Sequence, residues 1–543
     1  MHARRRVRAL ILIILSPVIF ASVGADDAAW VLEKGPDANG SVWEAIWQPV
    51  AHAFEFEANP RGTALAIADR QVLALITMKL ATTFSITPSL VWALVKASLF
   101  ALSIVATAVF LRQIRFRGAD KEIVGLRPST VAFVTITLPL VVAIGSKSQN
   151  NGSFNGWNFY PTLTYGTFVG YMLFAALVLR LSALLERSYR TWRAPVIGIM
   201  VLSAIAINLS YELVALVIPL SVLLLILAPR PDVGGVLARW RSALTILVPL
   251  LVTYTTLFVW IRWTMSQTSC HATDTCYAGT VVEVRGRTLL NNFLGSFPGN
   301  NGSLVTKQAK LFHRDFPSPN LASISIAVLA VVVLWALWSS WKARQPTPSP
   351  ASRSPGTHSS DDSRGLWMLL LVTACIAIGS TVITGISERA VEGITTPMLS
   401  YRNAVATWSA LSLGGITAVA LMARHSWRPV RYAAILALLA IVIGSIAAGL
   451  PRNVLSAQTN RKMLNTQFID TLHREVSIGD TSPTGDRRRC AALASEMDRR
   501  HVSSQEGLGR LATGAYRAFE FYHHKSFCST DTGLSTSDRE TLR

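Results

Sequence analysis

The chain has 543 residues, of which 51% are hydrophobic and only 15% are charged, and its mean hydropathy is +0.38. Apolar runs of about 17 to 22 residues, the length that an α-helix needs to cross a bilayer, recur before residue 450 and exclude a soluble globular protein. The net charge of +20 does not indicate a nucleic-acid partner, because the basic residues cluster between the apolar runs and form no stripe with aromatic residues.

The sequence predicts an all-α polytopic membrane protein with about eleven transmembrane helices. One long apolar stretch, residues 195–228, has polar Asn208, Ser210, Tyr211 and Glu212 at its middle and is interpreted as a tight hairpin of two spans. The predicted spans are residues 8–24, 88–111, 129–145, a run between 165 and 180, the two halves of 195–228, 243–263, 321–341, 366–385, 403–423 and 432–450.

Charge asymmetry predicts the orientation of these spans. The proposed inner connections are rich in Arg and Lys, whereas the three short outer connections hold only Lys147, Arg389 and Arg402. The N-terminus is therefore predicted in the cytoplasm and the C-terminus outside. The excess of Arg over Lys, with abundant Ala and Val, favours a GC-rich bacterium, so the predicted location is a bacterial plasma membrane.

Four segments interrupt or follow the predicted bundle of residues 1–450. Residues 25–87 are expected to hold interfacial helices, because Trp43, Ile46, Trp47, Val50 and Phe54 recur at helical spacing with polar residues opposite. The stretch 65–84 is also helical in pattern, but Asp69, Arg70 and Lys79 make it a poor span, and it is interpreted as interfacial or re-entrant. The other segments are a long outer loop (264–320), a disordered cytoplasmic linker rich in Pro and Ser (345–364) and an extracytoplasmic C-terminal domain (451–543).

Four of the five cysteines fall in segments that this topology places outside the cell. Disulfides Cys270–Cys276 and Cys490–Cys528 are predicted, because extracytoplasmic cysteines are usually oxidised. The alternative is a metal site that recruits His271, His523 and His524, but no pair of short Cys spacings completes a zinc site.

The N-terminus has two interpretations. Its basic start, apolar core and Val23-Gly24-Ala25 are typical of a secretory signal whose cleavage would leave Asp26 and Asp27 at the mature N-terminus. The alternative, which we favour, keeps the first helix as a membrane anchor.

Asp26 and Asp27 stand where the first span should emerge at the outer boundary of the membrane. An Asp-Asp pair after the first span, followed by interfacial helices, a many-helix bundle and an outer C-terminal domain, resembles the GT-C glycosyltransferases that use polyprenyl-phosphate sugars. Among these it is most similar to the actinobacterial arabinofuranosyltransferases of cell-wall synthesis. The resemblance covers the architecture of the whole chain, and its sequence motif is the single Asp-Asp dipeptide.

The resemblance implies an inverting enzyme that transfers sugar from a polyprenyl-phosphate donor to a cell-envelope glycan or glycolipid. Either Asp26 or Asp27 would act as the general base toward the acceptor hydroxyl, while its neighbour would orient it or hold a divalent cation such as Mg²⁺ or Mn²⁺. Basic residues would stabilise the departing lipid phosphate. The candidate substrate-binding residues at the predicted outer rim are Lys147, Glu212, Lys307, Lys310, His313, Arg314, Arg389 and Arg402.

Each candidate also has a plain structural interpretation. The two aspartates can mark a helix end, Glu212 a solvated turn, residues 307–314 a solvated face, and Arg389 and Arg402 interfacial anchors. The rival functions are a transporter or flippase of a lipid-linked or polar solute and a polymerase or ligase of lipid-linked glycans. Transporters bind near the midplane with charged residues within spans, whereas this chain shows few charges in its spans and no internal repeat.

Overall fold

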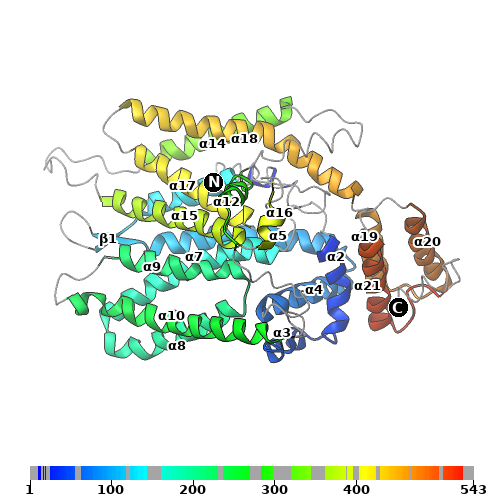
Figure 1. Ribbon diagram of the computed structural model, residues 1–543. Coiled ribbons are helices and arrows are strands. Elements are labelled where there is room, and N and C mark those ends of the chain that lie inside the picture. The colour runs from blue at the N-terminus through cyan, green and yellow to red at the C-terminus, as the bar shows by residue number, and fades with distance from the viewer. Residues whose placement is uncertain are drawn as a thin grey trace.

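The structure is a computed structural model that describes residues 10–13, 16, 19, 25–55, 63–117, 123–142, 161–229, 236–268, 283–297, 319–343, 361–386, 388–395, 403–423, 428–463, 466–499 and 505–529. Long helices lie side by side in a bundle, and a smaller group of helices stands at one end of it (Figure 1). The bundle contains α5 (Pro88–Gln113), α6 (Pro128–Val142), α7 (Pro161–Arg187), α8 (Tyr189–Asn208), the 3₁₀ helix η1 (Glu212–Leu216), α9 (Val217–Leu227), α10 (Val236–Ser266), α14 (Leu321–Ala343), α15 (Asp361–Gly385), α17 (Ala404–Met422) and α18 (Arg428–Met463).

Seven of the described helices are long and apolar enough to cross a bilayer, namely α5, α7, α8, α10, α15, α17 and α18. Shorter apolar helices occupy residues 128–139, 212–227 and 321–336. The chain is thus an all-α polytopic membrane protein, as its composition predicts. The number of eleven spans stays a prediction, and most of its first span lies outside the described residues.

The predicted hairpin within residues 195–228 is present. Helix α8 ends at Asn208, η1 begins at Glu212, and α9 runs back to Leu227. The side-chain amide of Asn208 donates to the carbonyl oxygens of Ala204 and Tyr254 at 3.0 and 3.2 Å, which ties the tip of the hairpin to α10. The polar residues at the middle of this apolar stretch therefore mark a turn, as expected.

A small β-hairpin, absent from the predicted all-α fold, follows α5. Strand β1 (Arg115–Arg117) pairs antiparallel with β2 (Ile123–Gly125), and Phe116 faces Val124 across the ladder. It packs on the start of α15, where a Cβ on Gly365 would stand only 2.7 Å from the side chains of Phe116 and Leu126. Because α15 already begins at Asp361, the last four residues of the predicted linker, 361–364, are helical.

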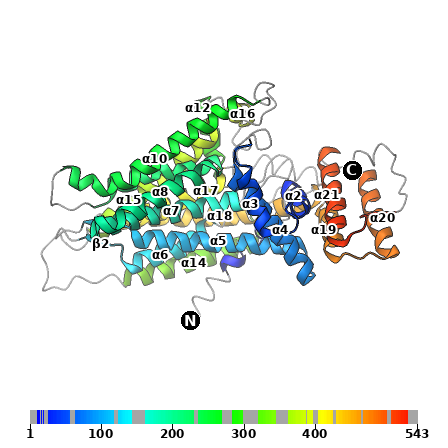
Figure 2. The same ribbon diagram turned by 90° about the horizontal axis from the view of Figure 1, so that it is seen from below.

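The bundle has two distinct ends (Figures 1 and 2). The β-hairpin lies at one of them, which we call the β-hairpin end. Helices α2 (Ala25–Asp37), α3 (Val42–Ala51) and α4 (Ala64–Phe84) lie at the other, which we call the α2 end. Two short helices, α12 (Gly286–Leu294) and α16 (Glu388–Gly393), pack near the C-terminal end of α15, where Asn292 donates to the Thr381 carbonyl at 2.8 Å.

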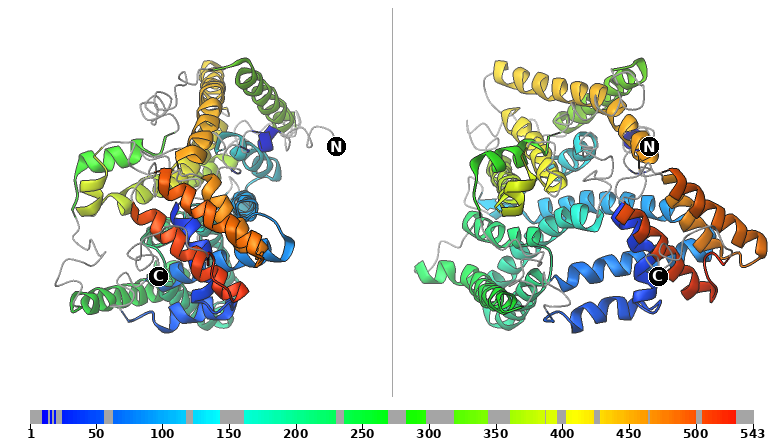
Figure 3. Two further views of the ribbon diagram at one scale, coloured as in Figure 1. Left: turned by 90° about the vertical axis from the view of Figure 1, so that its right-hand side faces the viewer. Right: turned by 45° about the vertical axis from the view of Figure 1, so that its right-hand side comes forward.

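Beyond the α2 end lie α19 (Thr466–Ile478), α20 (Pro483–Arg499) and α21 (Gln505–His523), and Figure 3 shows α21 beside α2. These helices share a hydrophobic core with α2 to which Val31, Leu32, Leu472 and Phe519 contribute. Helix α18 leads into this group and reaches Met463, past the predicted end of the bundle at residue 450.

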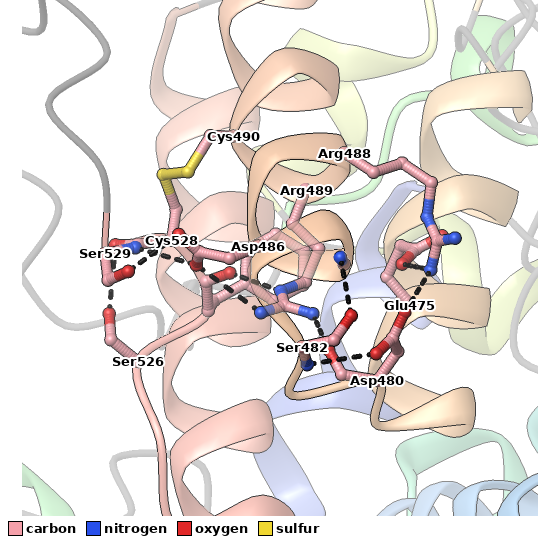
Figure 4. A network of polar contacts seen from close by, with 12 residues as sticks. Glu475, Asp480, Ser482, Asp486, Arg488, Arg489, Cys490, Ser526, Cys528 and Ser529 are labelled. Carbon is pink, nitrogen blue, oxygen red and sulfur yellow. Dashed lines mark hydrogen bonds and ion pairs between the residues drawn. A yellow bond between two sulfur atoms is a disulfide. The ribbon is translucent and has the colours of Figure 1, made fainter.

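The predicted disulfide Cys490–Cys528 is confirmed. Next to it, buried Arg489 donates to the backbone carbonyls of Phe527 and Asp480 and lies 3.4 Å from a carboxylate oxygen of Asp486 (Figure 4). A buried guanidinium is tolerated only when its donors are paired in this way. The disulfide and Arg489 together hold the chain after α21 against α20.

Candidate functional site

Asp26 and Asp27 lie in α2, which the structure describes from Ala25 to Asp37. The Asp-Asp pair is therefore part of a helix at the α2 end.

The C-terminal helices fix the position of α2. The Nε2 atom of His473 on α19 lies 3.0 Å from the carbonyl oxygen of Ala28, and Arg517 on α21 forms an ion pair with Asp37 at 3.0 Å. His473 is fully buried, and this burial lowers its pKa, so the ring is neutral and Nε2–H donates to the carbonyl. The backbone that follows the two aspartates is thus held by a residue almost 450 positions away.

Arg70 joins three separate segments at the α2 end. Its guanidinium carbon lies 4.4 Å from the ring centroid of Trp30 on α2 and 5.6 Å from that of Tyr211 in the α8–η1 turn. The N–H of Leu65 also donates to the Leu209 carbonyl at 2.9 Å, so the first turn of α4 is bonded to the same turn. The Asp-Asp turn, α4 and the hairpin tip are thereby brought together.

A cavity of about 340 Å³ lies beside this junction, between α4, α7, α8 and η1. Its lining contains both polar and apolar residues. The polar residues include Asp69, Arg70, Thr162, Ser210 and Tyr211, and the apolar ones include Phe174, Ile207 and Val217.

Asp69 is the carboxylate of this cavity. Its side chain faces the open space, but protein surrounds it on most other sides, and this burial raises its pKa above the usual value. A hydrogen bond from Thr162 and the charge of Arg70 act in the opposite direction. A carboxyl group with a raised pKa, next to a cation, is a common arrangement in functional sites.

The cavity follows the axis of α7. Its lining runs from Thr162 to Phe174, a helical rise of about 18 Å. Gly166 and Gly170 lie between them, and neither has another atom within 4 Å of the position of a Cβ, so the missing side chains leave the groove open. A groove with charged groups at one end and an apolar remainder fits an amphiphile with a polar head and a single chain.

Lys96 is a buried lysine of α5, with only 1% of its surface exposed. It lies one turn beyond Trp92, whose ring belongs to the same hydrophobic core as Ala28 and Ala29 of α2. Ionisable residues within membrane-spanning helices are costly and usually functional. Lys96 is therefore a candidate functional residue within the bundle.

The predicted site residues divide into three groups. Glu212 is exposed and directly follows Tyr211, which lines the cavity, and Asp26 and Asp27 share a helix with Trp30. Arg389 belongs to α16. The remaining predicted residues lie outside the described part of the chain, namely Lys147, Lys307, Lys310, His313, Arg314, Arg402, Cys270 and Cys276.

Sequence reasoning missed Asp69, Arg70 and Lys96 as site residues. Asp69 and Arg70 are visible in the sequence as charges that interrupt an apolar helix, but this pattern alone indicates only that the helix is a poor span. For Lys96 the only signal is a single lysine within an otherwise apolar run. Among the described residues, no three His, Cys, Asp or Glu side chains are grouped as metal ligands.

Comparison with known proteins shows no match to any family model, any curated protein or any solved structure.

Proposed function

We propose that this protein is a membrane glycosyltransferase of the GT-C type, which transfers a sugar from a polyprenyl-phosphate donor to a cell-envelope glycan or glycolipid. The reaction would take place at the α2 end, on the outer face of a bacterial plasma membrane. The observation that carries the proposal is the Arg70 junction, which connects α2, the helix that contains Asp26 and Asp27, to a cavity with charged and apolar lining residues.

The reaction requires a base and a cation, and both are present at this end. A carboxylate of Asp26 or Asp27 would remove the proton from the acceptor hydroxyl as that oxygen attacks the anomeric carbon. The bond from this carbon to the phosphate oxygen would break, and the phosphate would leave with an additional negative charge. Arg70 is suited to stabilise that charge, because a guanidinium donates two parallel hydrogen bonds to a phosphate.

The cavity suits the lipid part of such a donor. Its apolar length along α7 would hold the first isoprene units, while Arg70 and Asp69 at the polar end would contact the phosphate and the sugar. An acid with a raised pKa can donate a hydrogen bond to a sugar hydroxyl when protonated and accept one when ionised. Asp69 is therefore a positioning candidate, whereas Asp26 and Asp27 are the catalytic candidates.

The test is sugar transfer in membranes that contain the purified protein, with a radiolabelled polyprenyl-phosphate sugar as donor. Asp26→Asn or Asp27→Asn should lower the rate by about 10²- to 10⁴-fold, as expected for the loss of a general base. Glu55→Gln, which neutralises an exposed acid after α3, is the matched control and should leave the rate unchanged.

A deletion strain provides the second readout. If both Asn variants restore its envelope glycan as well as the wild type does, the glycosyltransferase proposal is contradicted. A loss of solute uptake in that strain with normal glycan would instead favour the transporter.

A further inference from the structure

A second cavity, of about 680 Å³, lies between the N-terminal portions of α8 and α10. It is lined by Tyr189, Arg193, Ile197, Arg241, Leu244, Thr245, Val248 and Pro249. None of these residues belongs to the cavity at the α2 end. The proposed function makes no use of it.

This cavity lies at the opposite end of the bundle from α2. Farther along α10, Trp260 contacts Phe54, just after α3, with ring centroids 5.0 Å apart. Arg241 precedes Trp260 by 19 positions in the same helix, which is a rise of about 28 Å. This distance is close to the thickness of the hydrocarbon core, so a bilayer crossed by α10 would have Arg241 and Trp260 at its two interfaces.

Two arginines from different helices, Arg193 and Arg241, line this cavity, and Arg241 contacts an aromatic ring. The guanidinium of Arg241 lies 4.0 Å from the ring centroid of Tyr189, whose hydroxyl is 3.0 Å from that of Thr245. Thr245 in turn donates to the Arg241 carbonyl at 2.8 Å. A guanidinium carries several N–H donors, and a contact with one ring does not use all of them.

The rest of the lining is aliphatic and open. Leu244 is 41% and Val248 is 50% exposed, and both follow Arg241 along α10 toward the middle of the membrane. Aliphatic side chains at this depth face lipid chains. A free phosphate ion would fill only a small part of the cavity and would make no use of this apolar strip.

We infer that the cavity between α8 and α10 binds an anionic phospholipid from the leaflet at the β-hairpin end. Arg193 and Arg241 hold its phosphate, and one acyl chain lies along Leu244 and Val248. Basic pockets between spans are suited to such headgroups, because two guanidinium groups offset the negative charge while the chains stay in hydrocarbon. This site is separate from the proposed reaction site and does not depend on it.

For the test, the full-length protein is first delipidated and then titrated with phosphatidylglycerol or phosphatidylcholine. Native mass spectrometry measures how much of each lipid binds. The wild type should retain phosphatidylglycerol in preference to phosphatidylcholine. The double variant Arg193→Gln/Arg241→Gln should bind phosphatidylglycerol about tenfold more weakly. A large excess of inorganic phosphate should not displace the lipid from the wild type.

Two further variants distinguish binding in this cavity from a general effect of surface charge on lipid binding. Arg187→Gln/Arg190→Gln removes the same charge from exposed positions outside the cavity and should retain the lipid. Val248→Trp fills the aliphatic strip without a change of charge and should also weaken binding. The proposal would be overturned if the Arg193/Arg241 double variant retained phosphatidylglycerol as well as the wild type does. It would also be overturned if the Arg187/Arg190 control variant lost the lipid to the same extent as the Arg193/Arg241 variant, or if the wild type bound both lipids equally.

Discussion

The Nε2 atom of His473 lies 3.0 Å from the carbonyl oxygen of Ala28, the residue that directly follows Asp27. This bond joins the C-terminal helices to the turn that carries the two candidate catalytic aspartates. Any change in how α19 packs against α2 should therefore alter the position of that turn.

The docking of the C-terminal helices should weaken in mild acid. The pKa of His473 is lowered in the folded protein, so below about pH 6.5, the ordinary value for histidine, the unfolded state binds the proton more readily. Stability is therefore lost as the pH falls through that value, and above it His473 contributes no pH dependence. Protease cleavage between α18 and α19 should accelerate between pH 7.5 and 5.

Two variants of His473 test whether this residue causes the loss of stability in acid. His473→Gln keeps a donor for the Ala28 carbonyl but does not titrate, so its cleavage rate should vary less with pH than that of the wild type. His473→Leu has no donor and should be less stable than the wild type at pH 7.5 by roughly 1 to 3 kcal/mol. Identical pH profiles for the wild type and His473→Gln would show that another group is responsible.

The disulfide should stabilise the C-terminal helices substantially. Cys490 and Cys528 are 38 positions apart, and closing a loop of this length stabilises the folded state by about 4 kcal/mol in the chain-entropy relation. Cys490→Ser/Cys528→Ser should unfold this region at lower denaturant concentration, and a reducing agent should have the same effect on the wild type. Cys375→Ser, which removes the free thiol of α15, serves as the control. A reducing agent that destabilises the Ser double variant as much as the wild type would contradict this role.

Filling the cavity at the α2 end should impair the use of the lipid donor. Gly170→Leu places a side chain in the groove along α7, so the KM for the polyprenyl-phosphate sugar should rise about tenfold with expression unchanged. Gly198→Leu on α8 is the matched control, because that glycine also has open space at its Cβ position but does not line the cavity. Equal kinetics for the two Leu variants would exclude the groove as the donor site.

Helix α3 should lie at the headgroup level of the membrane. Trp43 and Trp47 are 67% and 54% exposed and stack with their ring centroids 6.1 Å apart, an arrangement suited to the interfacial region. A nitroxide label at Trp43→Cys, in a Cys375→Ser background, should report a shallow depth by electron paramagnetic resonance. A label at Leu202→Cys, exposed within α8, should report a position deep in the hydrocarbon. Equal depths at the two sites would contradict this placement.

The sequence by itself determined the class of the protein and the positions of most of its helices. A bilayer imposes a length and an apolar composition on every span, so α5, α10 and α17 could be located from local pattern alone. The turn at Asn208 and the Cys490–Cys528 bond were predictable for similar reasons, since a polar cluster within an apolar stretch and a pair of outer cysteines are both local signals.

Only the tertiary structure decided how the candidate site is built. The contacts of Arg70 with Trp30 and Tyr211, and of His473 with Ala28, join residues that are up to 445 positions apart. No local pattern encodes such contacts, because they depend on how helices pack once each has formed. For the same reason, the sequence alone indicates only that Asp69 is a charged residue in an otherwise apolar stretch. Its significance arises from the cavity, which exists only when α4, α7 and α8 are packed together.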